Sequence, residues 1–372
     1  MPSACKFGEA KVMTKSRADE KEMIQLFALL LFFLTFVSMN IHSVSKVLPF
    51  LFAFVVWPTV LFSQSRDAML RARVDSVLTA KYYSGKYDTA YIGRPRERLM
   101  FKLRANISGS DFDIERRVDG MVGRSNFSTD HKATISIGAN YRGITAGLAF
   151  NPASMKGKNN DYELNMNAYT NRYGIDVIYQ QSKTLSGSSE SNGVVYPIEK
   201  GMVGLRMLNV NGYYAFNGRR FSYPAAFSQS YIQKRSAGSW LVGFSYMGGR
   251  IKTTEEKPVD SPDIRVFVGH LAVGGGYGYN LVVGKHLLFH LSTLPTLVIA
   301  NRNNIRIDGE RRDMDTKFPD FILTERAAII YNFNSRYFLG TTFVLSHSLL
   351  GDKNVDINYR KWRQRTFFGF RL

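Results

Sequence analysis

The sequence predicts an all-β protein, an antiparallel transmembrane β-barrel of about 12 strands that follows a cleaved N-terminal apolar signal segment. Three observations support this fold class. Apolar and polar residues alternate along the chain, which sorts them onto the two faces of strands. The alternating segments have about the 9–11 residues that a tilted strand needs to cross a membrane. Short and long connections alternate between them, as in outer-membrane barrels.

Two apolar runs, 24–39 and 47–62, stand at the start of the chain. Each is shorter than the roughly 20 residues of a membrane-spanning helix, and prolines interrupt the second run. A basic residue before the second run and small polar residues after it are typical of a signal peptide. Residues 1–64 are therefore predicted to be an N-terminal extension and signal peptide, with Met39 as a candidate translation start. A two-helix membrane anchor is the alternative interpretation.

The rest of the chain divides into a periplasmic lead-in, residues 65–97, and a barrel domain, residues 98–372. In the lead-in, Val74, Val77 and Leu78 fit one face of a short helix.

In the barrel domain, period-two alternation marks the expected strands. They are 99–107, 131–141, 143–150, 161–170, 172–181, 203–216, 237–251, 265–279, 285–299, 322–333, 336–348 and 362–372. The residues expected to face lipid include Ile135, Ile137, Leu164, Met166 and Val177.

The connections between these strands are short turns on one rim and longer loops on the other. The longer ones are 108–130, 151–160, 182–202, 252–264, 300–321 and 349–361. The connection 217–236 breaks the alternation, because a short turn is expected there. Either it folds as an elaborate periplasmic turn, or it hides an extra strand paired with one in 108–130. The second case would raise the number of strands to 14.

Composition excludes several functional classes. The formal net charge is +19, but the 49 basic residues are spread along the chain without a stripe or a recognition motif, which argues against nucleic acid as a partner. The single cysteine, Cys5, excludes a disulfide scaffold and a cysteine zinc site. A soluble secreted β-sandwich also alternates, but the aromatic residues at both ends of many strands favour the two interfaces of a membrane.

The candidate site is the set of polar residues on the inward face of the strands. These are Glu163, Asn165, Asn167, Asp176, Asn209, Asn211, His286, His290 and Arg326. A charge inside a narrow barrel has to be paired, so we expect these groups to bind one another and fill the lumen. The alternative is that they line a channel.

An enzyme is a further alternative, since histidine and serine could form a hydrolytic site for lipid acyl chains. Ser346 and His347 cannot partner each other, because adjacent residues on a strand point to opposite faces. A catalytic set would have to assemble from distant strands. His286 and His290 lie roughly 13 Å apart on a strand, too far to share one metal ion. No catalytic residue, cofactor or metal is therefore assigned.

Two stretches resemble an uncharacterised family of Gram-negative bacteria, domain of unknown function 4421. One is Tyr87-Asp88-Thr89-Ala90-Tyr91-Ile92. The other begins with Ser222-Tyr223-Pro224-Ala225-Ala226-Phe227 and runs on to Ser239. The resemblance covers residues from about 80 to the C-terminus, and it implies an outer-membrane barrel without implying an activity.

The sequence thus predicts a protein of the cell outer membrane, acting as a narrow channel or as a structural or surface-binding barrel. An outer-membrane lipid-modifying enzyme, an acyl hydrolase or transferase, is the alternative function. The expected partners are outer-membrane lipid and, during insertion, the barrel-assembly machinery. This machinery reads alternating terminal strands such as the one ending at Phe368, Phe370 and Leu372.

Overall fold

The computed structural model describes residues 86–97, 99–118, 121–141, 144–150, 161–191, 193–258, 261–313, 319–351 and 355–372, together with Arg73 and Ser76. Apart from these two residues, all belong to one unit of the chain, Leu78–Leu372. The predicted signal peptide lies outside the described residues, as do Val74, Val77 and Leu78 of the predicted helix. No helix in the described part of the chain is long and apolar enough to cross a membrane.

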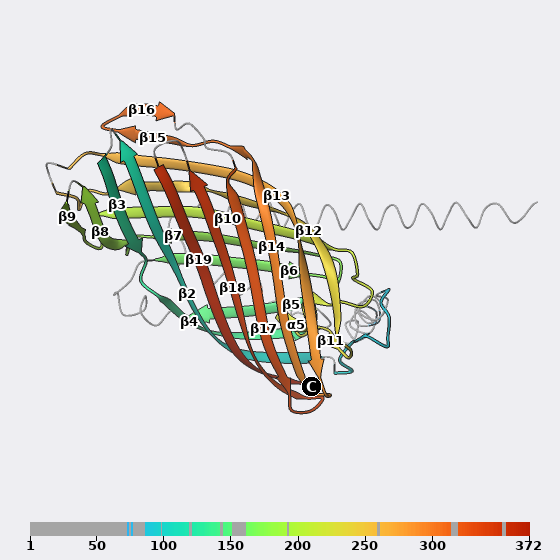
Figure 1. Cartoon of the computed structure of the whole chain (residues 1–372). Helices are drawn as coiled ribbons and strands as arrows, with labels where there is room; N and C mark the ends of the chain where they lie inside the picture. Colours follow the sequence, from blue (N-terminus) through green and yellow to red (C-terminus); the bar gives the residue numbers. More distant parts are fainter. Residues whose placement is uncertain are drawn as a thin grey trace, which may run out of the picture. The chain divides into compact units, whose positions relative to one another are not determined.

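Twelve long antiparallel strands form the wall of a barrel in the described ranges (Figure 1). They are β2 (Leu99–Val118), β4 (Lys132–Tyr141), β5 (Ile144–Phe150), β6 (Tyr162–Tyr169), β7 (Tyr173–Ser182), β10 (Val203–Ala215), β12 (Ala237–Thr253), β13 (Ile264–Val283), β14 (Leu287–Asn301), β17 (Phe321–Asn332), β18 (Tyr337–Gly351) and β19 (Val355–Arg371). The predicted all-β barrel and, in the described ranges, its count of 12 strands are confirmed.

Each of these strands pairs with its neighbour in the series from β6 through β7, β10, β12, β13, β14, β17, β18, β19, β2 and β4 to β5. The last strand, β19, pairs with the first, β2, from Val355 opposite Arg116 to Arg371 opposite Met100. In the order of the sheet, β5 is followed by β6.

One end of the barrel carries the longer connections, and we call it the loop end. Short strands extend the wall there: β3 (Met121–Ser128), β8 (Ser186–Ser191), β9 (Val194–Ile198), β15 (Asn304–Ile307) and β16 (Glu310–Asp313) (Figure 1).

Two of the predicted loops, 182–202 and 300–321, contain the short strands β8, β9, β15 and β16, and two others are largely strand. Much of 108–130 continues β2 and adds β3, and 349–361 is mostly the ends of β18 and β19. The alternation persists in both segments, but charged residues take the outer face and apolar residues the inner face.

The opposite end, which we call the terminal end, carries the short turns and the C-terminus. Leu99 and Leu372 exchange two backbone hydrogen bonds there. The connection 217–236, hereafter the plug segment, folds into the helix α5 (Tyr223–Phe227) and the short strand β11 (Ile232–Gln233). Strand β11 pairs with β1 (Ile92–Gly93) outside the barrel wall. The extra membrane strand considered for this connection is therefore wrong, and the elaborate turn is correct.

The local sequence explains why the plug segment turns into a helix. The Ser222 hydroxyl accepts a hydrogen bond from the Ala225 amide at the start of α5, and Pro224 lies in the first turn. An N-terminal cap and an early proline both favour a helix start, because the first amides have no partner within the helix.

The outer face of the wall is apolar over a broad belt. Ile135 and Ile137 are 50% and 57% exposed, and Met166 is also exposed, as the alternation predicted. Other exposed apolar side chains are Leu103, Ile107, Val242, Phe244, Leu271, Val273, Leu281, Leu291, Ile299, Ile329, Leu339 and Phe368. Exposed aromatic side chains stand toward the strand ends, including Tyr173, Trp240, Tyr279, Tyr331 and Tyr337. Such a belt with aromatic margins is typical of a wall that faces lipid.

Candidate functional site

The interior of the barrel is the candidate site, and it has three zones. The inward side chains of β19 show their order. Phe367 belongs to the apolar cluster around the plug segment, Lys361 and Arg363 lie in a charged zone, and Ile357 and Tyr359 belong to a second apolar cluster near the loop end.

The plug segment fills the terminal end of the interior. Phe221, Tyr223 and Ala226 are fully buried, and with Phe227 they pack against side chains of the wall. The Lys102 ammonium on β2 donates to the Ser228 carbonyl oxygen and to Gln229 Oε1 at 2.5 and 2.6 Å. Since the buried polar groups of the segment bind the wall, the plug is part of the folded interior.

Residues 86–97 hold the plug segment from its other side. Arg94 donates to the Ser230 carbonyl oxygen and to the Tyr231 hydroxyl at 3.1 and 2.5 Å, and its guanidinium lies 3.5 Å from the Tyr231 ring centroid. Asp88 lies 3.3 Å from the Arg220 guanidinium. The two stretches that carried the family resemblance, 87–92 and 222–239, are in contact with each other, since Ile92 pairs with Gln233 and the Lys234 amide donates to the Tyr91 carbonyl oxygen at 2.7 Å.

An ion-pair layer lies between the plug and the loop end. We define it by two pairs, Asp176–Arg326 at 2.9 Å and Glu163–Lys361 at 2.7 Å. Their side chains are 1–6% exposed. Arg363 donates to the Asn165 side-chain oxygen in the same layer. Both pairs join strands that are not neighbours in the wall, so they cross the interior. Such charges need their partners, because a lone buried charge is strongly unfavourable.

The other predicted site residues take different places. Asn209 and Asn211 on β10 are buried, and Asn211 accepts a hydrogen bond from the Thr324 hydroxyl at 3.4 Å. Asn167 is exposed. His286 lies in the turn before β14, where it is exposed and its Nδ1 is 2.6 Å from the Asn332 carbonyl oxygen.

Sequence reasoning missed Lys361 and Arg363 as partners of the predicted carboxylate and amide. Lys361 lies just before the strand that was predicted to begin at 362, and Arg363 lies within that predicted strand. Alternation could have placed both residues, because Lys361 and Arg363 have the same parity as the inward residue Arg371 of the same strand. The first part of β19 was nevertheless predicted to be a loop, because the polar residues Asp356, Asn358 and Arg360 lie there.

His290 is the centre of a hydrogen-bonded set beneath the plug. Its Nδ1 is 2.7 Å from Asn280 Oδ1, and its Nε2 is 3.0 Å from Ser292 Oγ. Asn280 Nδ2 donates to the Ser222 carbonyl oxygen and to Gln233, so its Oδ1 is the acceptor for the Nδ1 hydrogen. Nε2 is then the acceptor for the Ser292 hydroxyl, which is the arrangement of a serine nucleophile, a base and an orienting group.

This set is enclosed, however. Ser292 and His290 are each 3% exposed, and the rings of Phe221, Tyr223 and Phe227 surround the imidazole at 4.9–5.9 Å between centroids. In the closed barrel the set anchors the plug segment to β13 and β14. Neither Ser346 nor His347 joins it. Ser346 lies in the interior beside the ion-pair layer, and His347 points outward, where its Nε2 is 2.7 Å from Asn358 Oδ1.

The third zone is an apolar cavity of about 400 Å³ at the loop end. We call it the loop-end cavity. Its apolar lining comes mainly from β2, β10, β12, β13 and β19: Phe112, Ile114, Val203, Met207, Met247, Ile251, Val266, Val268, Ile357 and Tyr359. Arg116, Ser125 and Ser189 stand among the polar residues that line it. A volume of this size is within the range of small-molecule sites.

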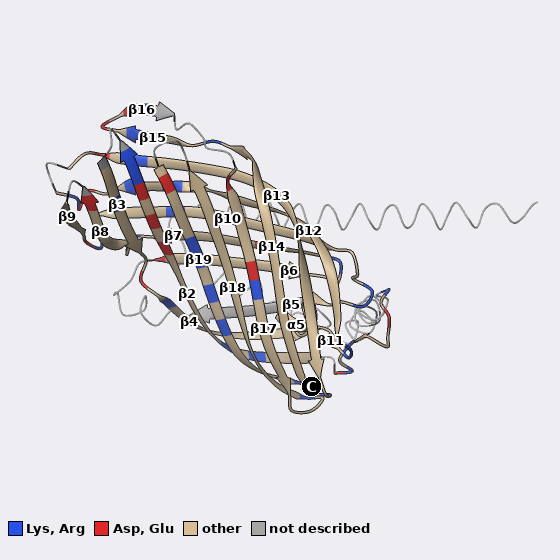
Figure 2. Ribbon diagram, in the orientation of Figure 1, with Lys and Arg blue, Asp and Glu red and all other residues tan. Residues whose placement is uncertain are grey.

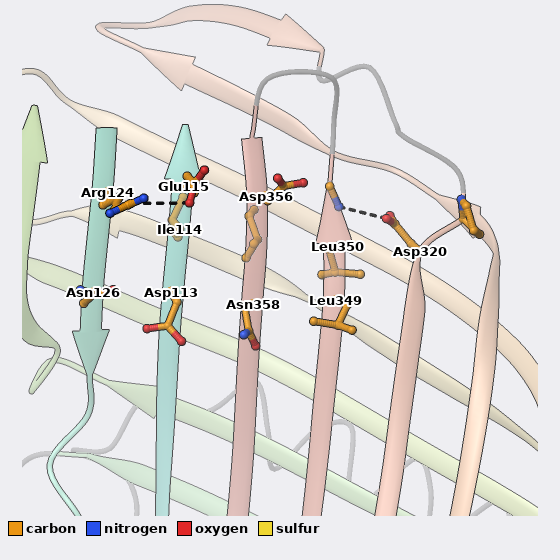
Figure 3. Close-up of a pocket in the computed structure, with 13 residues that line it drawn as sticks. Asp113, Ile114, Glu115, Arg124, Asn126, Asp320, Leu349, Leu350, Asp356 and Asn358 are labelled. Carbon is orange, nitrogen blue, oxygen red and sulfur yellow. Dashed lines mark hydrogen bonds and ion pairs between the residues drawn. The ribbon is translucent and has the colours of Figure 1, made fainter. Parts of the chain in front are cut away.

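A second hollow, of about 450 Å³, lies at the rim of the loop end beside β2, β18 and β19 (Figure 3). Asp113, Glu115 and Asp356 surround it, and Arg124 lies 3.6 Å from Glu115. Ile114, Leu350 and Ile357 line both hollows, so the two share a wall. Among the residues that the structure describes, no group of three or more His, Cys, Asp or Glu side chains could hold a metal ion.

Comparison with known proteins identifies the family. The family described as domain of unknown function (DUF4421) matches residues 86–372, and the chain belongs to it. No curated protein matches the chain.

The chain is similar to three solved structures, among others. The outer-membrane protease OmpT from Escherichia coli has 7% identity and a TM-score of 0.42, with 75% of this chain and 97% of that chain covered. The translocator domain of the autotransporter NalP from Neisseria meningitidis has 11% identity and a TM-score of 0.30, with 82% and 96% covered. Ail, the attachment invasion locus protein of Yersinia pestis, has 8% identity and a TM-score of 0.23, with 72% and 98% covered.

Proposed function

We propose that this member of the DUF4421 family is an outer-membrane β-barrel of a Gram-negative cell that is closed to solute flow and binds a ligand at its loop end. The belt of exposed apolar residues supports the membrane location, because such a surface is unfavourable in water. Residues 1–64 would direct export, and the assembly machinery of the outer membrane would insert the barrel.

The filled lumen carries the proposal. The plug segment occupies the terminal end and the ion-pair layer occupies the middle. A barrel of about eight strands is filled by its side chains alone and porins of 16–18 strands keep an aqueous channel, so a barrel of 12 strands is filled here by the plug segment together with side chains of the wall. The loop-end cavity is open to a ligand but separated from the terminal end by both zones, so binding fits this interior better than transport.

Fractionation and single-channel recording test the proposal. The protein should be recovered with outer membranes, should require detergent for extraction and should migrate differently on a gel before and after boiling. In planar bilayers the wild-type protein should give no current steps. A variant with residues 221–231 replaced by a flexible linker serves as the control and should give steps or noise. Recovery from a soluble periplasmic fraction, or stable wild-type conductance, would contradict the proposal.

The Ser292–His290–Asn280 set supports a second candidate function, an acyl hydrolase that acts only when the plug segment leaves the interior. Hydrolysis needs an accessible hydroxyl, which the closed barrel does not offer. A fluorophosphonate probe should then label the linker variant at Ser292 and spare the same variant carrying His290→Ala. An absence of labelling in both would leave the set with a structural role only.

A further inference from the structure

The wall around the loop-end cavity is charged on its outer face and apolar on its inner face, whereas the lipid-facing part of the wall is apolar on its outer face. Strands β2 and β19 carry charged residues on their outer face near the loop end, where Arg360 binds Asp113 at 2.8 Å and Arg117 binds Asp356 at 3.2 Å. Figure 2 shows acidic and basic residues along these parts of β2 and β19, while β18 is tan over its length. A charged outer face belongs in water, so this part of the wall stands beyond the lipid.

Over the same part of the wall, the side chains on the inner face are apolar. Phe112 and Tyr359 stack with their ring centroids 4.5 Å apart, and Leu205, Met207 and Met247 are buried beside them. The interior of an outer-membrane barrel is ordinarily polar. Charged outside and apolar inside is the pattern of soluble barrels that hold one small ligand.

The shape and lining of the cavity indicate the chemistry of the ligand. The cavity lies within the barrel wall, and its floor lies against the ion-pair layer, since Lys361 is two residues from Tyr359 on the same face. Methionine side chains, which adapt to flexible apolar groups, are among its walls. Water is poorly held in such a space because it offers few hydrogen-bond partners.

The charge of the lining indicates which polar group the ligand carries. One cation, Arg116, lines the cavity from the inner face of β2, whereas Lys252 and Glu190 alternate with the inward residues Ile251 and Ser189 and have their side chains on the outer face. The chain as a whole carries a net charge of +19. The local balance and the long-range field therefore both favour a negative group.

From this geometry we infer that the loop-end cavity binds one aliphatic chain with an anionic head group, the chain among Met207, Met247 and Val268 and the head group toward Arg116. The inference deepens the proposed function, since it names the ligand class of the same loop end. A free fatty acid and the acyl chain of an anionic phospholipid share this chemistry.

Binding of radiolabelled palmitate to the folded full-length barrel in phosphatidylcholine nanodiscs tests the inference, with empty nanodiscs subtracted. Palmitate should bind saturably at one site per chain. Val268→Trp, which fills the cavity, should weaken binding at least about tenfold, the effect of roughly 1.4 kcal/mol. Val242→Trp is the matched control on the same wall, since Val242 is 46% exposed on the outer face, and it should bind normally. A shift on boiling shows that each variant is folded.

Two further arms test the head group and its source. Arg116→Gln should weaken palmitate binding about fivefold and leave hexadecanol binding unchanged. Arg117→Gln, on the outer face, should change neither. Competition by phosphatidylglycerol as strong as by palmitate would identify a phospholipid chain, and weaker competition a free fatty acid.

No saturable palmitate binding by the folded wild-type barrel, or equal binding by Val268→Trp, would overturn the inference. Equal affinities for palmitate and hexadecanol would overturn the anionic head group. A barrel that fails to bind palmitate but stays in the outer membrane without conducting would leave the proposed function intact, so the two failures are distinguishable.

Discussion

The two ends of strand β2 follow the same alternation with opposite chemistry. Near the terminal end, Leu103 and Ile107 face outward and Lys102 lies in the interior against the plug. Near the loop end, Asp113 and Glu115 face outward and Phe112 lies in the interior. The outer face thus follows the surrounding solvent, lipid or water. The inner face is free to differ, because it meets only the lumen. Along β2 it changes from Lys102 against the plug segment, through Ser108 and Ser110, to Phe112 in the apolar loop end.

The largest expected difference between the halves concerns charge. Asp176→Ala leaves Arg326 buried without its partner, so it should lower the free energy of unfolding by about 3–5 kcal/mol. Asp111→Ala, on the outer face of the loop end, should change it by less than about 0.5 kcal/mol. Urea unfolding of the barrel in lipid vesicles measures both. Similar losses for the two variants would contradict the distinction between the ion-pair layer and the hydrated outer wall.

The next largest effect tests the lipid-facing belt. Met166→Arg places a cation against hydrocarbon and should cost about 2–4 kcal/mol near the midplane of the bilayer. Asn167→Arg changes the adjacent residue, whose side chain points to the other face, and should cost much less. The same unfolding measurement applies. Equal losses of unfolding free energy for the two variants would contradict a β6 with one face toward lipid and the other toward the lumen.

A smaller effect concerns Glu325, which lies on the outer face of β17 between exposed apolar residues such as Phe321 and Ile329. A carboxyl group is disfavoured there, so Glu325→Leu should raise the free energy of unfolding by about 1 kcal/mol. Glu115→Leu at the loop end, where the carboxylate binds Arg117 at 2.6 Å, should bring no gain. A destabilised Glu325→Leu barrel would show that this carboxylate has a role in the membrane region.

The smallest effect is a pH dependence at the loop end. The hydrogen bond from the Thr253 hydroxyl, followed by the nearby Arg265, lowers the pKa of Asp263 below its ordinary value. A lowered folded-state pKa gives a contribution that is present above the unfolded-state pKa and is lost as the pH falls through the folded-state value. Thr253→Val should therefore move the Asp263 titration, followed by NMR, to higher pH. An unchanged titration would contradict the assigned cause.

Alternation alone was sufficient to predict the twelve strands, because lipid on one side and a polar lumen on the other impose a period of two. It was not sufficient at the loop end. The first part of β19, with Asp356 and Arg360 on its outer face, was interpreted as a loop because charge was taken as a sign of irregular structure. The expectation of an apolar outer face fails where the strand leaves the lipid.

The plug segment could not be predicted from the sequence for a different reason. Its contacts join residues far apart in the chain, as in Lys102 with Gln229 and Arg94 with Tyr231, and no local period marks them. The inward polar residues Glu163, Asp176 and Arg326 could be placed on one face by parity. Which of them meet across the lumen depends on the closure of the barrel, which a single strand does not encode.

Cysteine labelling along β2 tests the reversal of the two faces most directly, in a Cys5→Ser background. Leu103→Cys and Ile107→Cys should react with a lipid-soluble maleimide and resist a charged one. Asp111→Cys and Asp113→Cys should react with the charged reagent, and Phe112→Cys should be protected by palmitate. Reaction of Asp113→Cys with the lipid-soluble reagent alone, as fast as Leu103→Cys, would contradict a wall that leaves the lipid before its loop end.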